Sequence, residues 1–445
     1  MVTVFTGLYK KCRCLWILFF ALLVSQQAIA QKNLTYYIEQ AKTFNPITKD
    51  NKNQSKINLL ETERLRAAMT KPQLVFNAGY TLAPILNFDN NKPRIDFNSQ
   101  GSNNYIGLDL SSTNGGNYQA MFALTLPLWA TEKFNPIAEQ LLVGNKITEN
   151  NIELANHDIE KNVADQYITC LTDLKLIDFS VSFLQLIDEQ RSIIRKLAEA
   201  ALAKQSDLTL LNIEYQKQNI NLTSYRNNYR RDFLDLNVLC GINDTTIQII
   251  EPIDRALPYS TVLSDTSFIQ NSKFTEKYRL DSINALAAQN VFELKYKPQI
   301  NGYINTGLNG NYIPDIEKRI GWSAGIGMTV YLFDGHQKDI NRNKTALLVQ
   351  TAATYKETFL IQNTIRKKRI VNEIKSLQER QTSLDAQIQE YNKLIATYKS
   401  ELVRGQISVL NLVTVLKDLT TLQQDFITIQ TQQQLLLNTY NYWKW

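Results

Sequence analysis

Two long stretches of the chain carry the seven-residue hydrophobic repeat of a coiled-coil helix. The stretch from Gln337 to Leu402 contains no Gly and no Pro. Its repeating positions are Ile370, Leu377, Leu384, Tyr391 and Tyr398, interleaved with Ile374, Gln381, Ile388, Ile395 and Leu402. Spacings of three and four residues sustained this long predict a coiled-coil seam. At a rise of 1.5 Å per residue, the helix would be about 100 Å long.

Each long helix is followed by a shorter one, so the pattern predicts two helical hairpins. Gly405 ends the second long helix, and Ser408–Tyr440 is the predicted return helix. In the first half, a helix is predicted from Thr131 to Ala203, a turn at Lys204–Asp207, and a return helix to Cys240. Its seam positions are Val163, Tyr167, Cys170, Leu174, Ile177, Val181 and Leu184. The hairpins lie about 200 residues apart, which indicates an internal duplication.

Strand patterns precede each hairpin. From Gly321 to Leu332, large apolar residues alternate with small or polar ones, and Leu74–Leu82 alternates in the same way. Tyr118–Leu126 and Gln299–Leu308 are the predicted partner strands. Segments of about 9–11 residues are long enough to cross a membrane as tilted strands. The connection from Ala83 to Gly116 is rich in Asn, Ser and Gly, which is typical of an external loop.

The first thirty residues have the pattern of a secretory signal peptide. A basic segment at Lys10–Arg13 precedes an apolar run at Leu15–Val24 and an Ala28-Ile29-Ala30 cleavage motif. A membrane anchor is the alternative. Cleavage after Ala30 would remove three cations and no acidic residue, so the formal charge of +6 would fall to +3. A nearly neutral mature chain argues against a nucleic-acid partner.

Residues for catalysis or metal binding are scarce. The chain has two histidines, His157 and His336, and they lie in opposite halves. Glu153 and Glu160 flank His157 at helical spacing, which is ordinary on a solvated helix face, so no metal site is expected. No phosphate-binding loop or nucleophile motif is present. We therefore expect no catalytic residues, no cofactor and no enzymatic activity.

Four strands raise the question of what covers their edges. Four strands cannot close a barrel, and open sheet edges are not tolerated in lipid. A soluble sheet with one wet face is the alternative. Three copies would supply a twelve-stranded barrel. The fold class predicted is therefore an α+β membrane protein, with duplicated long α-helical hairpins and four β-strands per chain contributing to a trimeric twelve-stranded β-barrel.

Two phrases in the sequence resemble those of TolC-like outer-membrane efflux proteins. Val330-Tyr331-Leu332-Phe333-Asp334-Gly335 is similar to the phrase at which a strand of that family leaves the membrane. Gly405-Gln406-Ile407-Ser408-Val409-Leu410-Asn411-Leu412 is similar to its periplasmic helix turn. The resemblance covers essentially all of the mature chain. His336 stands where the family often has a second Gly, and the first half lacks both phrases.

The resemblance implies a homotrimer in the outer membrane of a Gram-negative cell, with a large periplasmic part. Its strands would form a barrel in outer-membrane lipid and its helices a tunnel. It would act as the passive export channel of a tripartite efflux or type I secretion system. Its partners would be a periplasmic adaptor protein and an inner-membrane transporter. A periplasmic coiled-coil adaptor or scaffold without a barrel is the alternative. The cargo, the class of pump and the resting state stay open.

The predicted organisation follows the order of these patterns. It comprises a signal peptide at 1–30, an N-terminal helix at 31–71, a first transmembrane strand pair with its external loop at 72–129, a first periplasmic hairpin at 130–241, an equatorial linker at 242–263, a helix at 264–297, a second strand pair at 298–333 and a second hairpin at 334–445.

Three groups of site residues are predicted. At the strand-to-helix junctions, Gly335 would supply backbone freedom, Asp334 would cap the following helix, and Pro127 would serve the first half. The polar helix-turn tips, expected to dock a partner, are Lys204, Gln205, Asp207, Arg404, Gly405 and Gln406. By resemblance, Asn411 and Thr414 would line the pore aperture, where the family has acidic rings.

Cys170 and Cys240 are the cysteines that remain after cleavage of the signal peptide. Cys170 lies 34 residues before Lys204 and Cys240 lies 36 after it. Antiparallel helices would therefore bring them to within roughly 3 Å of the same height. An exported protein can form disulfides. Whether the two are bridged or are separate buried thiols stays open.

Overall fold

The computed structural model describes residues 32–89, 91–97, 102–107, 116–128, 130–253, 272–310 and 316–445. The predicted signal peptide and its cleavage site lie outside these residues, as do most of the second half of the predicted linker and the start of the helix predicted after it. The chain divides into two compact units. Unit 1 comprises residues 1–50, 152–272 and 360–445, and unit 2 comprises residues 51–151 and 273–359.

Two helices replace the single N-terminal helix predicted over 31–71. Helix α2 (Leu34–Phe44) is capped by Asn33, whose side chain accepts a hydrogen bond from the Tyr36 amide. Helix α3 (Pro46–Thr70) follows directly. The break falls at Asn45, whose ψ of 123° is extended. A residue before proline is disfavoured in helical geometry, which explains why the helix cannot run through Pro46.

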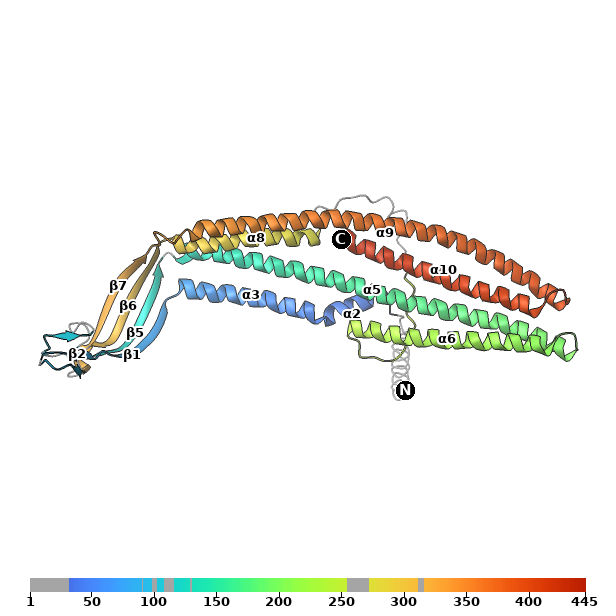
Figure 1. The fold of residues 1–445 in the computed structure, drawn as a ribbon, viewed down its shortest axis with the longest axis horizontal. Helices are drawn as coiled ribbons and strands as arrows, with labels where there is room; N and C mark the ends of the chain where they lie inside the picture. The colour runs from blue at the N-terminus through green and yellow to red at the C-terminus, as the bar shows by residue number, and fades with distance from the viewer. Residues whose placement is uncertain are drawn as a thin grey trace, which may run out of the picture. The chain divides into compact units, whose positions relative to one another are not determined.

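The two long helical hairpins are present. The first consists of α5 (Ala130–Glu199) and α6 (Gln205–Cys240), and the second of α9 (Gln337–Val403) and α10 (Val409–Lys444). Within each hairpin the helices run side by side (Figure 1). Gly241, with a φ of 65°, ends α6 in the left-handed conformation that glycine adopts without strain. The Ser408 side chain caps α10 by accepting from the Asn411 amide.

Unit 1 is held together by the predicted seams and by a third buried series on α5. This series has seven-residue spacing and consists of Asp173, Ser180, Ile187 and Ile194. A cluster near the turns joins Ile187, Ile194 and Leu211 of the first hairpin to Ile388 and Leu412 of the second. Further along, Tyr37 of α2 packs with Tyr167, Cys170, Phe233 and Cys240. The segment after α6 has no regular structure up to residue 253. It is fixed by hydrogen bonds from the Tyr167 and Tyr229 hydroxyls to the Glu251 and Gln248 carbonyls.

Unit 2 contains the sheet and the helical segments next to it. Helix α8 (Lys273–Glu293) ends in the short 3-10 helix η1 (Leu294–Tyr296), which replaces the end of the helix predicted over 264–297. Within this unit α8 lies along α9 (Figure 1), where Tyr278 stacks on Tyr355 and Phe274 packs on Phe359.

The sheet of unit 2 has four antiparallel strands in the order β1-β5-β6-β7. They are β1 (Gln73–Leu82), β5 (Gly116–Leu128), β6 (Gln299–Gly310) and β7 (Ile320–Thr329). β7 ends at Thr329 rather than at Phe333, because its partner β6 begins at Gln299, which pairs with Thr329. Among the described strands, none pairs with the residues beyond Thr329.

The connection between β1 and β5 is more ordered than the predicted loop. It holds a small sheet of β2 (Ile85–Asn87), β3 (Arg94–Asp96) and β4 (Tyr105–Ile106). Its polar anchors are Asn87, which donates to Asp96 and Ser102, and Asp89, which accepts from the amides of Asn103 and Asn104. These short-range bonds compensate for strands too short to be stable by pairing alone.

None of the described helices has the length and apolar character needed to cross a membrane.

Candidate functional site

The four-stranded sheet has one apolar and one polar face. Directly paired residues of antiparallel strands point to the same side. Register therefore groups Phe76 with Phe122, Thr306 and Trp322, and Leu74 with Leu124, Ile304 and Ala324. The whole apolar face consists of Leu74, Phe76, Ala78, Tyr80, Leu82, Gly116, Tyr118, Ala120, Phe122, Leu124, Leu126, Leu128, Ile300, Gly302, Ile304, Thr306, Leu308, Gly310, Ile320, Trp322, Ala324, Ile326 and Met328.

The opposite face carries polar and small residues in the same register. Asn77 pairs with Met121, and Asn305 pairs with Ser323. The Tyr303 side chain lies over Gly325. A Cβ added at Gly325 would be 2.5 Å from the Tyr303 hydroxyl oxygen. On the apolar face, Trp322 is 79% exposed and Ile326 is 74% exposed. A large apolar surface left open in the single chain marks a site of contact with lipid or protein.

The second strand-to-helix junction is organised around Asp334. The Tyr296 hydroxyl donates to its carboxylate, and Lys295 Nζ lies 3.7 Å away. The amides of Gln337 and Lys338, in the first turn of α9, also donate to it, and all these contacts lower the pKa of Asp334, with the Tyr296 bond as the largest cause. Asp334 thus sits where the predicted cap should be, and it joins the end of η1 to the start of α9.

The chain turns at this junction through two consecutive left-handed residues. Gly335 has a φ of 68° and His336 a φ of 65°. The left-handed conformation is strained for a residue with a Cβ, which accounts for a preference for glycine at both positions. His336 occupies a position that favours glycine, so its backbone is strained at the junction.

Replacing His336 with glycine is expected to stabilise the chain by about 1 kcal/mol, because glycine removes the left-handed strain. The midpoint of chemical unfolding measures the effect. Gly335→Ala is the matched control, since it adds the same strain one residue earlier and should lower the midpoint. A lower midpoint for His336→Gly would show that the imidazole contributes more than its backbone costs.

Pro127 lies inside β5, two residues beyond the end of the pairing with β1. It is paired with Asn301 of β6, whereas the register with β1 ends at Gln73 and Thr125. Proline lacks an amide donor and is tolerated where one side of a strand has no partner. Helix α5 begins three residues later, at Ala130. The first junction therefore has a different geometry from the Asp-Gly turn of the second.

The two helix turns have the same backbone geometry with different residues. Gly405, with a φ of 72°, follows α9, and the Gln406 amide donates to the Glu401 carbonyl. In the first hairpin Ala201 has a φ of 58°, and the Leu202 amide donates to the Leu197 carbonyl. Ala201, not Lys204, is thus the counterpart of Gly405. Lys204 is the N-cap residue of α6, and its side chain makes no capping bond.

The predicted tip and aperture residues lie at these turns. Lys204, Gln205, Arg404, Gly405 and Gln406 are exposed, whereas Asp207 is half-buried in the first turn of α6. Asn411 and Thr414 are exposed in the first turns of α10, and the Thr414 hydroxyl donates back to the Leu410 carbonyl. In the single chain the side chains of both candidate aperture residues are open to solvent.

Cys170 and Cys240 belong to one buried cluster but are free thiols. The Cys240 thiol donates to the Tyr37 carbonyl at 3.3 Å, which directs it toward α2. Burial raises the pKa of both thiols, so neither is reactive as a thiolate. The sequence left open whether Cys170 and Cys240 form a disulfide or stay separate buried thiols. In the structure they are separate buried thiols.

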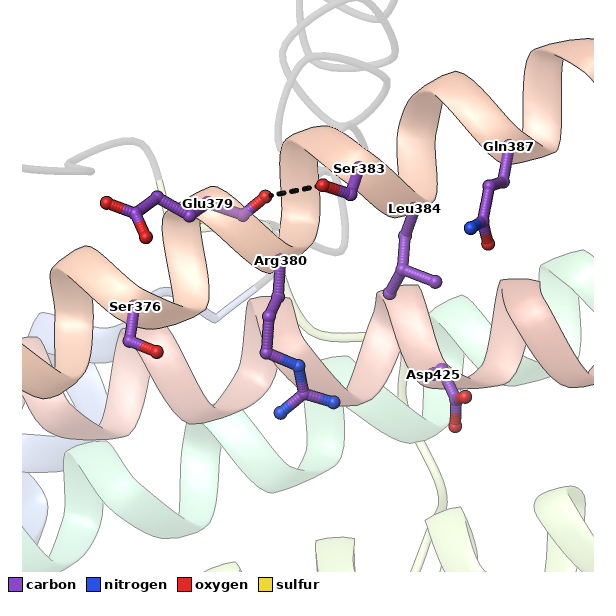
Figure 2. A pocket seen from close by; sticks show the side chains of 7 residues that line it. All are labelled: Ser376, Glu379, Arg380, Ser383, Leu384, Gln387 and Asp425. Atoms are coloured by element: carbon purple, nitrogen blue, oxygen red, sulfur yellow. Dashed lines mark hydrogen bonds between the residues drawn. The ribbon is translucent and has the colours of Figure 1, made fainter.

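Grooves along the hairpins are lined by both polar and apolar side chains. One of about 350 Å³ lies between α9 and α10 and is lined by Arg380, Leu384 and Asp425 with their neighbours (Figure 2). A larger one of about 1010 Å³ lies between α5 and α6, around Tyr215 and Arg226. Within the described part of the chain no group of acidic, histidine or cysteine side chains could hold a metal ion.

The comparisons with known proteins bear on this fold. No protein-family model matches the sequence, and no curated protein matches it. Among solved structures, CusC, a transmembrane channel protein, has a TM-score of 0.70 at 11% identity, with coverage of 93% of this chain and 92% of the other. The chain has the fold of the TolC-like outer-membrane channels. CmeC of Campylobacter jejuni (TM-score 0.67, 12% identity, covering 93% and 85%) and VceC of Vibrio cholerae (0.66, 12%, covering 92% and 95%) share it.

The chain also contains a feature that the hydrophobic sequence patterns did not indicate. Asp173 of α5 and Asp232 of α6 are buried together inside the first hairpin. The sequence does contain an indication that Asp173 is buried. Asp173 and Ser180 precede Ile187 and Ile194 at seven-residue spacing, and together they form the third buried series of α5. Because the first two members, Asp173 and Ser180, are polar, the series does not have the pattern of a hydrophobic repeat.

Proposed function

We propose that the chain is the outer-membrane export channel of a tripartite efflux or type I secretion system. The observation that carries the proposal is the exposed apolar face of the four-stranded sheet, backed by a polar face, on the fold of outer-membrane channels. An apolar outer face suits lipid and a polar inner face suits a water-filled passage. Conduction would be passive, with the driving force supplied by an inner-membrane transporter.

A homotrimer accounts for surfaces that the single chain leaves open. β1 and β7 are the edge strands of the sheet, and three copies would pair them into a closed barrel. Unit 2 also exposes apolar side chains at seven-residue spacing on α9, where Ile340 precedes Leu347 and Leu348 precedes Tyr355. Such a stripe fits a seam between helices of neighbouring copies.

The proposed channel would lie in the outer membrane, with its helices in the periplasm. Signal-peptide cleavage after Ala30 would deliver the chain there. The Asp334 junction would then mark the level at which the sheet leaves the lipid and the helices begin. Its contacts with Lys295 and Tyr296 suit this level, because lysine and tyrosine favour membrane interfaces.

Current through the channel tests the proposal directly. Purified protein in a planar bilayer should conduct ions with weak cation preference, since the candidate aperture residues Asn411 and Thr414 are neutral. Asn411→Asp should raise cation preference about twofold or more, because a ring of carboxylates would focus negative potential. Thr428→Asp, at an exposed position further along α10, is the control. Unchanged selectivity in Asn411→Asp would place Asn411 off the pore, and absence of current in every preparation would contradict the channel.

Docking of a periplasmic adaptor is expected at the helix-turn tips. Lys204 and Arg404 are exposed cations at the two turns. Reversing both charges, Lys204→Glu with Arg404→Glu, should abolish export in cells without lowering the amount of trimer, because the folded core does not contact these side chains. Export at the normal rate in the double variant would exclude the tips as the docking site.

A further inference from the structure

A pair of carboxyl groups lies inside the first hairpin of unit 1. Asp173 belongs to α5 and Asp232 to α6, and the two carboxyl groups lie close enough to each other for Asp232 to act on Asp173. Asp173 is 6% exposed and Asp232 is 7% exposed. They lie one turn after Cys170 and Tyr229, which are buried in the same core. Two acidic side chains from opposite helices therefore meet at a buried level of the hairpin.

Among the described residues, Arg231 is the cation in contact with the pair. Arg231 Nε donates to Asp232 Oδ1 at 2.8 Å, but the Arg231 side chain is largely exposed to solvent. Asp173 Oδ2 has no hydrogen-bond donor among the described residues. Two carboxylates can only accept, so the contact between them becomes a hydrogen bond only when one of them carries a proton.

The other charged or titratable groups nearby do not neutralise Asp173. On α6, Asp235 adds further negative charge, and on α5 Lys175, two residues after Asp173, donates to Gln430 of α10. The Cys170 thiol and Tyr229 hydroxyl stay neutral, because burial raises the pKa of each. Burial first, and then Asp232, raise the pKa of Asp173 to about 7.

We propose that Asp173 and Asp232 bind one proton between them, and that this proton holds α5 against α6 at this level of the first hairpin. When the proton leaves, two negative charges face each other in a buried seam, and the hairpin loosens there. The inference goes beyond the proposed export function, since it makes the packing of one hairpin dependent on the pH around it.

The direction of the pH dependence follows from the raised pKa. The folded chain holds the proton more tightly than the unfolded chain, whose aspartates titrate near pH 4. Stability should therefore fall as pH rises from about 4 to about 7 and level off above that range. For a buried carboxylate stabilised by cations the dependence would have the opposite sign.

Infrared spectroscopy and thermal unfolding of the full chain in detergent test the proposal. Between about pH 6 and pH 8.5, the wild type should lose the carbonyl stretch of a protonated carboxyl, and its unfolding midpoint should fall by about 2 °C or more. Asp173→Asn should lack this spectral change and have a flatter pH dependence, because its amide can donate to Asp232 at any pH. Asp178→Asn, exposed on α5, should behave like the wild type.

Two results would overturn the proposal. One is a wild-type spectrum without a protonated carboxyl at about pH 6. The other is a pH dependence equal in wild type and Asp173→Asn, as expected if the pair only sets the helix register. Should Asp173→Asn fail to assemble, Asp232→Asn is judged by the same criteria. None of these readouts depends on conductance, so failure of the proton site and failure of the channel proposal are distinguishable.

Discussion

Gly307→Ala is expected to prevent assembly of the four-stranded sheet. Gly307 has a φ of 143°, a conformation that a residue with a Cβ adopts only under strain. The added Cβ would lie 2.3 Å from the Ala120 carbonyl oxygen and 2.8 Å from the Met121 Cα. Both are backbone atoms of β5, so the strand pair itself would have to separate. Strain and overlap together should cost about 3 kcal/mol or more.

The effect can be measured as the amount of folded protein recovered from the outer membrane. Gly302→Ala is a matched control on the same strand, because its added Cβ would approach no described atom closer than 3.7 Å. It should be recovered at the wild-type level. Equal recovery of Gly307→Ala and Gly302→Ala would show that β5 and β6 do not approach as closely as the structure has them.

Ile326→Lys is expected to reduce outer-membrane assembly strongly. Ile326 lies on the apolar face that we assign to lipid, where a lysine costs about 2–4 kcal/mol near the middle of the bilayer. Since Ile326 is 74% exposed in the single chain, the same substitution would be almost neutral on a water-facing surface. The variant therefore separates a membrane channel from a soluble adaptor or scaffold.

Ser323→Lys is the control for this prediction. Ser323 lies on the polar face of the same strand and is also exposed, so a lysine there should be tolerated in a water-filled lumen. Heat-modifiable migration of the membrane-extracted protein measures folding of both variants. Equal yields of Ile326→Lys and Ser323→Lys would contradict the assignment of the two faces.

Repeating hydrophobic patterns made much of the fold predictable. The seven-residue series of the long helices mark buried positions such as Tyr167, Ile370 and Ile374. The alternation around Trp322 marks the apolar face of the sheet. Such patterns repeat over many residues, so each further repeat strengthens the prediction. The turn before α9 was also predictable, because Gly335 marks a position where the backbone needs the freedom of glycine.

Features without a repeat could not be predicted in this way. The small sheet of β2, β3 and β4 depends on Asn87 and Asp89 bonds within a polar segment that has the composition of a loop. The left-handed turn at Ala201 has no glycine to mark it. Asp173 and Asp232 meet only because α5 and α6 are aligned along their axes in one particular way. That alignment results from packing along the whole seam and not from any short motif.

The mass of the membrane-extracted protein tests the central claim most directly. Protein released from the outer-membrane fraction by mild detergent should have three times the mass of the mature chain, whose precursor is 51.1 kDa. Trimer formation would pair the open edges of β1 and β7 and cover the apolar stripes of the helices. A folded monomer that retains its strand content, recovered from the soluble periplasmic fraction, would contradict the account.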